Sequence, residues 1–452
     1  MSGLEASLEK MRAAGLGEAA LQSFAHYYEQ LRAGAGGVLR EADIEPLEDL
    51  PALEDLPAGS APVGEAVVLK LNGGLGTSMG MTKAKSLLEV KDGLTFLDVI
   101  ARQVLDLRAR TGARLPLVLM SSFATREDSL AALRTYPALE VDVPLDFMQN
   151  RVPKLRADTL EPVRWPADPA LEWAPPGHGD LYVALKTSGM LETLLERGYR
   201  YAFVSNSDNL GAVLEPRVLA WMAREQIPFV AEAPVRTESD RKGGHLARRR
   251  DGGALVLRET SQIADEDVEA FEDLSRHRYF NANNLWIDLR ALADLLDERG
   301  GVLGLPMIVN RKTVDPTDPS SPAVIQLETA MGAAVGVFEG ARAIQVPRAR
   351  FVPVKTTDDL LVLRSDAYRL GEGWRVELDR TPPVPPLVEL DPRYFKVLRE
   401  FDARFPAGPP SLIACRRLRV RGDVTFGRDV VVRGTVELDG PTRIEDGAVL
   451  EG

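Results

Sequence analysis

The segment VVLKLNGGLGTSMGMTKAKSLLEV (residues 67–90) decides the fold, because an apolar run is followed there by a glycine-rich turn and two lysines. An apolar run of this length is typical of a buried strand. Glycines let the backbone approach an anion closely, so that consecutive N–H groups can point at it. Lys83 and Lys85 follow the turn, where they would neutralise a phosphate chain lying on the loop. The segment therefore predicts a strand that leads into an anion-binding loop.

Three explanations compete for this loop. A Walker A loop requires G-x-x-x-x-G-K-[ST], and no register of the segment supplies that pattern. A dinucleotide fingerprint requires G-x-G-x-x-G; Gly74 and Gly76 fit it, but Met79 takes the third glycine position and Gly80 comes one residue late. The third explanation is a tight turn that binds nothing, and the two lysines count against it.

Short apolar runs alternate with amphipathic segments from residue 65 onward. This alternation predicts an α/β fold with a mostly parallel, doubly wound sheet. Ligands of such sheets bind outside the carboxyl ends of the strands, so a site is expected in the loops after Leu71, Met120 and Ser205. The predicted strands are 66–71, 116–120, 201–205 and 228–233, and the predicted helices are 95–110, 126–136 and 215–226.

Two proline-rich stretches divide the chain. Residues 1–32 carry apolar side chains at helical spacing and predict a helix that glycines at 34–37 end. Residues 45–62 are acidic and proline-rich, which predicts an extended strap, and TPPVPP (381–386) marks a second boundary. The expected organisation is an N-terminal helical segment and strap (1–62), a large α/β domain (63–385) and a C-terminal domain (386–452).

The C-terminal domain has a different pattern. Residues 391–405 predict a helix. From Leu418 onward aliphatic residues alternate with polar ones, and glycines recur roughly every six residues. This pattern is compatible with coils of a β-helix, each needing a turn glycine and an inward aliphatic side chain, and also with a stack of hairpins.

Composition bounds the function classes. The 452 residues suffice for about three domains, or for one large α/β domain with additions. Hydrophobic residues make up 45% and charged residues 27%, which excludes a disordered, collagen-like or simple coiled-coil chain. The net charge of −12 argues against a nucleic-acid partner, and the run RRR (248–250) is interpreted as a solvated hairpin tip.

Cysteine usage and the N-terminal sequence indicate where the protein works. Cys415 is the only cysteine, which excludes an intrachain disulfide and a cysteine-based zinc site. The first ten residues carry acidic charge where a signal peptide has a basic region, and no apolar run is long enough to span a membrane. We therefore expect a cytoplasmic protein with no membrane partner.

The loop N-G-G-L-G-T-S-M-G, followed by K-S, resembles the signature loop of the eukaryotic-type UTP–glucose-1-phosphate uridylyltransferase (UDP-glucose pyrophosphorylase) family. The resemblance continues in order from about residue 66 to 366, and it rests on the strings PLVLMSSFATRED, FMQNRVPKL, PPGHGDLY, SNSDNLGA, FNANNLWI, IQLETAMGAA and VPRARFVPVKTTDDLL. It implies a Rossmann-like, GT-A-like nucleotidyltransferase domain with a doubly wound mixed sheet. It also implies that the C-terminal segment is a short left-handed β-helix.

The resemblance also implies which residues hold the nucleotide. Backbone groups of the loop would contact it, Lys85 would neutralise phosphate charge, and Lys355 would contact the α-phosphate and the sugar phosphate. Gln149 would hydrogen-bond the uracil edge, since a carboxamide offers a donor and an acceptor. The family commonly has Gly-Pro where Lys83 and Ala84 stand here, so Lys83 is either a rival of Lys85 or a solvated surface lysine. The implied nucleotide-binding residues are Leu71, Asn72, Gly73, Gly74, Gln149, Gly177, Asp208 and Lys355, and the implied catalytic residues are Lys85 and Lys355.

A metal ion and the sugar phosphate complete the implied site. Asp208 follows a predicted strand and suits Mg²⁺ held by few protein oxygens; its alternative role is to cap an Asx turn. Asn284 or Glu328 would equally satisfy buried backbone groups. Asp358 and Asp359 are interpreted as a helix N-terminal pair after a threonine cap rather than as metal ligands. The implied sugar-phosphate residues are His178, Asn206, Ser207, Asn281, Asn283, Asn284 and Glu328.

The implied reaction joins UTP and α-D-glucose 1-phosphate into UDP-glucose and pyrophosphate. A sugar-phosphate oxygen is already a nucleophile at neutral pH, so catalysis would consist of positioning and electrostatics. The alternatives are a UDP-N-acetylglucosamine or broad UDP-sugar pyrophosphorylase, a non-catalytic UDP-sugar sensor, and a dehydrogenase that ignores UTP. A monomer or small homo-oligomer is expected, because the segment after Asp439 is short.

Overall fold

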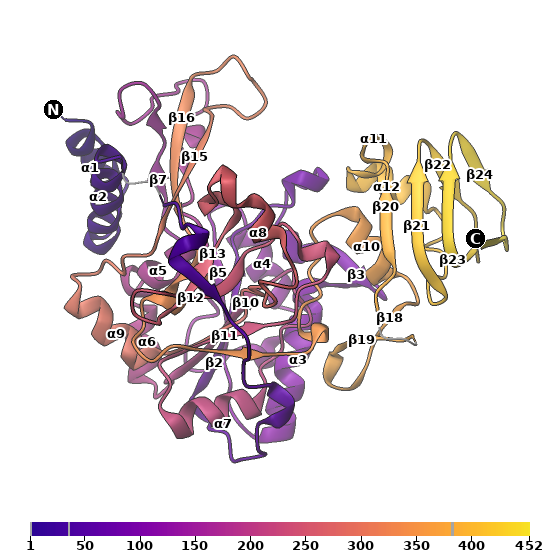
Figure 1. The fold of residues 1–452 in the computed structure, drawn as a ribbon, viewed down its shortest axis with the longest axis horizontal. Coiled ribbons are helices and arrows are strands. Elements are labelled where there is room, and N and C mark those ends of the chain that lie inside the picture. The colour runs from indigo at the N-terminus through magenta and orange to yellow at the C-terminus, as the bar shows by residue number, and fades with distance from the viewer. Residues whose placement is uncertain (1, 35–36, 381–383) are drawn as a thin grey trace.

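The computed structural model describes residues 2–34, 37–380 and 384–452. A seven-stranded sheet lies at its centre, in the order β17–β11–β14–β10–β2–β5–β6 (Figure 1). Strand β14 runs antiparallel to both of its neighbours and the other pairs are parallel, so the sheet is mixed. All four predicted strands are confirmed within it. The strands are β2 (Ala66–Asn72), β5 (Leu117–Ser121), β6 (Asp146–Met148), β10 (Tyr201–Asn206), β11 (Phe229–Ala233), β14 (Leu285–Asp288) and β17 (Arg342–Gln345).

Helices cover both faces of this sheet. Successive residues of β2 alternate between two apolar cores: Val68 belongs to one, whereas Val67 and Leu69 belong to the other. Side chains at alternate positions point to opposite faces, so the strand is buried on both sides. The first core is completed by α3 (Phe96–Thr111), α4 (Arg126–Leu133), α7 (Pro216–Glu225) and α10 (Thr357–Arg364), and the second by α5 (Leu181–Thr187), α6 (Met190–Glu196) and α9 (Leu289–Glu298).

Three predicted helices differ from the structure. The single helix expected over 1–32 is two helices, α1 (Gly3–Ala13) and α2 (Glu18–Arg32), because Gly15 has a φ of +76°. The helix expected over 126–136 ends at Leu133, shortly before Pro137, whose ring disfavours helical backbone in the preceding residue. The helix expected over 391–405 is interrupted by extended backbone at Val397, giving α11 (Pro392–Phe395) and α12 (Leu398–Arg404).

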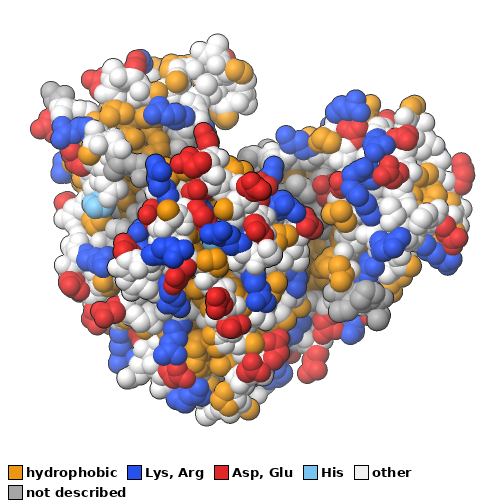
Figure 2. Space-filling view, viewed as in Figure 1, with side chains coloured by type: hydrophobic (Ala, Val, Ile, Leu, Met, Phe, Trp, Pro, Cys, Tyr) orange, Lys and Arg blue, Asp and Glu red, His pale blue; other side chains and the backbone are white. Residues whose placement is uncertain are grey.

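The N-terminal strap crosses the body of the molecule (Figure 1). Its strand β1 (Ile44–Pro46) pairs with β12 (His245–Arg249), which forms the predicted hairpin with β13 (Leu255–Arg258). Arg249 and Arg250 at the hairpin tip are exposed and pair with Asp251 and Glu45. On the face shown in Figure 2, basic and acidic side chains intermix over this region rather than gathering by sign.

A second hairpin, β15 (Met307–Thr313) and β16 (Ala323–Thr329), packs with β8 (Leu155–Arg156) against α1 and α2. The remaining short elements are peripheral: β3 (Glu89–Lys91), β4 (Leu94–Thr95), β7 (Val152–Pro153), β9 (Trp173–Ala174), β18 (Tyr368–Leu370), β19 (Val376–Leu378) and α8 (Val268–Glu272). No helix in the described part of the chain is long and apolar enough to cross a membrane.

Parallel strands make up the C-terminal segment, which lies to one side of the body (Figure 1). Paired residues such as Leu418 and Val436, or Val431 and Val449, keep the same offset of eighteen residues in sequence. Hairpins join antiparallel strands, so the stack of hairpins is wrong. Residues 381–383 of the predicted boundary lie outside the described residues. The strands are β20 (Leu387–Leu390), β21 (Cys415–Arg421), β22 (Val424–Phe426), β23 (Val431–Asp439), β24 (Thr442–Ile444) and β25 (Val449–Glu451).

Leu418 tests whether these parallel strands enclose a packed core. Its side chain is fully buried, whereas Val449 in β25 is 51% exposed. Leu418→Ala should lower the apparent free energy of unfolding of this segment by about 2–5 kcal/mol, since it leaves a cavity. Val449→Ala should change it by less than about 0.5 kcal/mol. Urea denaturation followed by circular dichroism measures both, and equal losses would contradict the packing described.

Candidate active site

The parallel pairing of β2 and β10 brings two loops to one edge of the sheet. Leu71 lies opposite Asn206, and the N–H of Ser207 donates to the carbonyl of Leu71 at 3.1 Å. The loops that follow enclose a cavity of about 300 Å³. Most of the residues expected in the site line it together: Leu71, Gly73, Gly74, Lys85, Gln149, Gly177, His178, Asn206, Ser207 and Asp208, joined by Met120 and Pro175.

The glycine loop closes on itself. Leu75 and Ala84 form an isolated antiparallel bridge, and the N–H of Lys85 donates to the carbonyl of Gly74 at 3.0 Å. The next α-helix after the loop begins only at Phe96. A dinucleotide fingerprint needs a helix that starts directly at its glycine turn, so that explanation of the loop is excluded.

Lys85 and Asp208 form an ion pair at the cavity wall. Lys85 Nζ lies 2.7 Å from Asp208 Oδ2, and their side chains are 18% and 21% exposed. The ion pair joins the loop after β2 to the loop after β10, so each holds the other at the cavity wall. Lys83, by contrast, is exposed and does not line the cavity. Lys85 and Asp208, which the sequence analysis predicts as the phosphate-binding cation and the metal-binding carboxylate, are therefore adjacent.

Gln149 lies directly against the glycine loop. A Cβ atom on Gly73 would come within 2.5 Å of Gln149 Oε1, so a larger residue there would displace the Gln149 amide from this position. The backbone N–H of Gln149 donates to Ser121, and Ser122 Oγ donates to the carbonyl of Gly73 at 2.9 Å. These contacts hold the backbone of Gln149 and of the glycine loop, and the Gln149 side chain brings a donor and an acceptor to the cavity.

Gly177 and His178 also line the cavity. Gly177 has a φ of +81°, and a Cβ there would lie 2.5 Å from the carbonyl oxygen of Thr329. The N–H of Met331 donates to His178 Nδ1 at 3.0 Å. A neutral imidazole with an acceptor at Nδ1 carries its proton at Nε2. Burial lowers the pKa of His178 to about 4, so this side chain is a neutral hydrogen-bond donor near pH 7.

Other predicted site residues do not line the cavity. The Asn72 side chain is buried and donates to Ser129 Oγ at 2.8 Å. The side-chain amide of Asn281 donates a hydrogen bond to Asn283 Oδ1. The Asn284 side chain is fully buried and hydrogen-bonded to Asn209 and Glu232. Glu328 lines a separate cavity between α2 and the 176–180 loop.

Lys355 is exposed, although the flanking Val354 and Thr357 are buried. Its ammonium lies 5.9 Å from the centroid of the Phe351 ring. The N–H of the preceding residue, Val354, donates to the carbonyl of Asp208 at 3.2 Å. Lys355 is therefore tied through the backbone to the loop that carries Asp208.

The acidic pair after Lys355 forms the predicted helix start. Thr356 caps α10 in a capping box with Asp359, whose Oδ2 accepts the N–H of Lys355 at 2.7 Å. Asp358 accepts the N–H of Leu390, and burial raises the pKa of Asp358 to about 6. The interpretation as a helix N-terminal pair is confirmed.

Glu259 is a candidate residue that the sequence did not reveal. The neighbouring Asn281 and Lys355 both lower the pKa of its carboxyl. Burial nevertheless raises the pKa of Glu259. Glu259 directly follows β13 in the string LRET (257–260), which matches no motif, so nothing in the local sequence identifies it as a site residue.

His178 offers a direct test of this geometry. Because burial lowers the pKa of the imidazole, it should stay neutral from pH 8 down to about 5 and titrate with a midpoint of about 4. NMR of histidine-labelled protein, with the resonance assigned by comparison with His178→Asn, measures this midpoint. A midpoint near the ordinary value of about 6.5 would show that the ring is solvated rather than bonded to Met331.

The chain resembles proteins of one family throughout. Residues 21–433 match the family model described as UTP–glucose-1-phosphate uridylyltransferase. The barley (Hordeum vulgare) protein of that name is 41% identical over 89% of this chain and 84% of its own length, and a probable one from Schizosaccharomyces pombe is 40% identical over 86% and 76%.

Solved structures agree with the sequence comparison. A mutant UDP-glucose pyrophosphorylase from Leishmania major, in complex with UDP-glucose, is 47% identical, with a TM-score of 0.94 over 100% of this chain and 98% of that one. UDP-glucose phosphorylase from Trypanosoma brucei is 45% identical, with a TM-score of 0.90 over 100% and 99%. The chain belongs to the UTP–glucose-1-phosphate uridylyltransferase family.

Proposed function

We propose that this chain transfers the uridylyl group of UTP to α-D-glucose 1-phosphate and so forms UDP-glucose and pyrophosphate. The observation that carries the proposal is the meeting of the glycine loop, Gln149, Lys85 and Asp208 in one cavity. Relatives that are 40–41% identical over 86–89% of this chain carry the name of this activity, and UDP-glucose is bound in the Leishmania major complex.

The chemistry requires placement more than proton transfer. An oxygen of the sugar phosphate attacks the α-phosphorus of UTP, and the bond from that phosphorus to the bridging oxygen of pyrophosphate breaks. The attacking oxygen is already ionised, so no general base is required. Lys85 at the cavity wall and Lys355 would stabilise the charge that develops at the α-phosphate. Lys85 would exchange part of its contact with Asp208 for phosphate oxygens.

Mg²⁺ suits the residues present. Among residues 2–34, 37–380 and 384–452, no cluster of three or more His, Cys, Asp or Glu side chains could hold a metal ion. Mg²⁺ does not require such a cluster, because one or two carboxylates and the substrate phosphates suffice. Asp208 supplies that carboxylate, and when bound the ion would add charge stabilisation at the phosphates.

The other contacts follow from the groups that each wall offers. Gln149 would read the uracil edge, with Gly177 against the base. His178 would donate Nε2–H to the sugar or its phosphate, and Asn206 and Ser207 would face the sugar. Asn281, Asn283 and Glu328 would reach sugar hydroxyls only if the substrate extends beyond the cavity. Asn72 would act through its backbone, since its side chain is bonded elsewhere.

Sugar selectivity distinguishes the proposal from its alternatives. A pyrophosphate-release assay with UTP should show the highest kcat/KM with glucose 1-phosphate. Higher activity with N-acetylglucosamine 1-phosphate, or equal activity with galactose 1-phosphate, would favour the sister activities. Binding of UDP-glucose without turnover would favour a sensor.

The finer features of the fold belong to the same proposal. The constant offset of eighteen residues supports coils of a short left-handed β-helix, and the helices on both faces support a Rossmann-like, doubly wound catalytic domain over 63–385. We expect a cytoplasmic monomer or small homo-oligomer, and a stable octamer in sedimentation would contradict this.

Asp208 tests the metal proposal. Asp208→Asn should lower kcat by about 10²-fold or more while UTP binding measured without metal stays similar, because the lost charge acts mainly in the transition state. Steady-state kinetics at saturating Mg²⁺ checks this result. Near-wild-type kcat would show that another group holds the ion.

The three lysines test the register of the loop. Lys85→Ala and Lys355→Ala should each lower kcat and kcat/KM together, at a cost of about 2–4 kcal/mol or roughly thirty- to a thousand-fold. Lys83→Ala is the matched control, since Lys83 is exposed, and should cost less than about tenfold. A larger loss in Lys83→Ala than in Lys85→Ala would move the phosphate-binding role to Lys83.

A further inference from the structure

The loop that carries Asp208 is held at both ends by one buried lysine. Lys70 Nζ in β2 donates to Ser205 Oγ at 2.6 Å and to the carbonyl of Ala212 at 2.8 Å. Ser205 and Ala212 lie at the two ends of the loop, so the Lys70 side chain links these ends by hydrogen bonds. Burial is the main reason that the pKa of Lys70 falls to about 7, and the nearby Arg350 adds to it. The second buried cation near Lys70 is the guanidinium of Arg350.

Asn209 ties the same loop to the segment that leads to Lys355. Asn209 Oδ1 accepts the N–H of Val352 at 2.9 Å, and Asn209 Nδ2 donates to the carbonyl of Arg350 at 3.2 Å. Asn209 and Pro353 also form an isolated antiparallel bridge. The Asn209 side chain is almost fully buried, so water does not compete for these bonds.

Glu232 and Arg350 form the centre of this network. Arg350 binds both carboxylate oxygens of Glu232, at 2.7 and 2.5 Å, and donates to the carbonyl of Val213. Trp286 and Asn284 donate to the same carboxylate at 2.9 and 3.1 Å. The Glu232 side chain is fully buried, and a bidentate arginine pair fixes direction as well as distance.

Asn284 links the ion pair to the loop. Its Nδ2 donates to Glu232 Oε2 and to the carbonyl of Arg350, and its Oδ1 accepts from Asn209 Nδ2 at 3.1 Å. Both donors and the acceptor are therefore engaged within the protein, which leaves its amide little capacity for a sugar hydroxyl. A continuous chain of hydrogen bonds runs from Glu232 through Asn284 to Asn209, the residue next to Asp208.

We infer that Glu232, Arg350, Asn284 and Asn209 are positioning residues, which set the placement of Asp208 relative to Lys355. The inference rests on the proposed function, in which these two charged groups act on the same α-phosphate. None of the four lines the cavity. They act through the backbone of the two segments they join: misplacement of reacting groups by about 1 Å costs roughly a hundredfold in rate.

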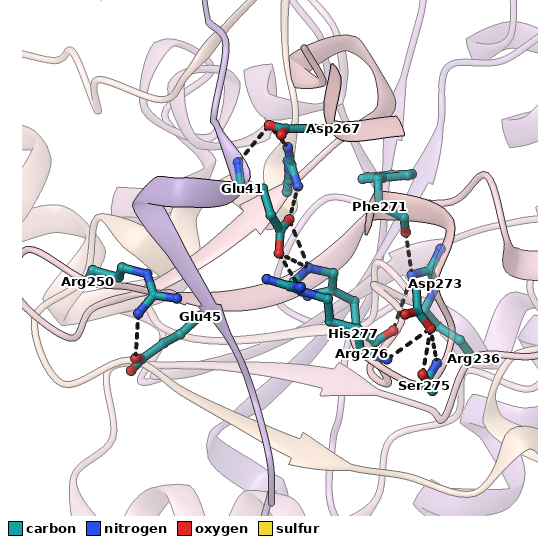
Figure 3. A network of polar contacts seen from close by, with 11 residues as sticks. Glu41, Glu45, Arg236, Arg250, Asp267, Phe271, Asp273, Ser275, Arg276 and His277 are labelled. Carbon is teal, nitrogen blue, oxygen red and sulfur yellow. Dashed lines mark hydrogen bonds and ion pairs between the residues drawn. The ribbon is translucent and has the colours of Figure 1, made fainter. Parts of the chain in front are cut away.

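A comparable ion-pair network elsewhere in the molecule supplies the control. Glu41, just before β1, binds the fully buried Arg258 at 2.6 Å, and Arg276 and His277 bind the same carboxylate (Figure 3). Removing the charge of Glu41 takes away one of the two carboxylates that bind this buried arginine, and Asp267 remains at 2.8 Å. None of these residues lines the cavity, so loss of this pair should affect stability without affecting placement.

The experiment compares Glu232→Gln and Asn209→Ala with Glu41→Gln in the full chain. Glu232→Gln and Asn209→Ala should accelerate amide hydrogen exchange in peptides covering 206–213 and 350–356, and lower kcat at least about tenfold with a smaller change in the KM for UTP. Glu41→Gln should lower the melting temperature but leave exchange in those peptides and kcat within about twofold of wild type. Asn209→Ala leaves the Glu232–Arg350 pair intact, so it remains informative where Glu232→Gln is too unstable.

The outcomes separate this inference from the proposed function. A folded Glu232→Gln or Asn209→Ala protein with wild-type exchange and kcat would overturn the inference, and so would a failure of both variants to fold, because the network would then serve stability alone. A wild-type chain without activity toward UTP and glucose 1-phosphate would refute the proposed function, and hydrogen exchange would still report whether the network holds the two segments.

Discussion

The parallel pairing of β2 with β10 is the constraint on which the rest of the site depends. It puts Leu71 opposite Asn206, so that the glycine loop and the Asp208 loop leave the sheet at the same edge. The ion pair between Lys85 and Asp208 then joins the two loops at 2.7 Å. Because both strands are buried on both faces, a one-residue shift in register would move each side chain into the opposite core, where it would not match the packing. The packing of the core therefore fixes the relative position of the two loops.

The cavity walls are made by backbone as much as by side chains. Gly73 allows Gln149 to lie against the loop, and Gly177 allows close approach to Thr329. Behind these walls, charged groups are buried only where partners hold them, as in the Glu232–Arg350 pair. Such pairs contribute less to net stability than to direction, since the cost of desolvation offsets much of their attraction. A buried pair that fixes direction but adds little net stability suits a site whose function is to position reacting groups.

The sequence predicts the parts of this arrangement that are local. The strand before the glycine loop, the helix start with its threonine cap and acidic pair at 356–359, and the hairpin at 248–250 each carry their signal within a few residues, and each is confirmed. The break at Gly15 was missed, because a single glycine does not interrupt a helical pattern strongly. Glu259 and the Glu232–Arg350 pair could not be predicted, since their partners lie far away in the chain and single polar residues carry no periodicity.

A crystal structure of the chain with UDP-glucose tests the central claim most directly, namely that this one cavity binds the nucleotide sugar. The account predicts uracil within hydrogen-bond distance of Gln149, the diphosphate between Gly74 and Asp208, and Lys85 turned toward a phosphate oxygen. UDP-glucose bound outside the cavity, or bound inside it with the uracil away from Gln149 and the Lys85–Asp208 pair undisturbed, would contradict the account.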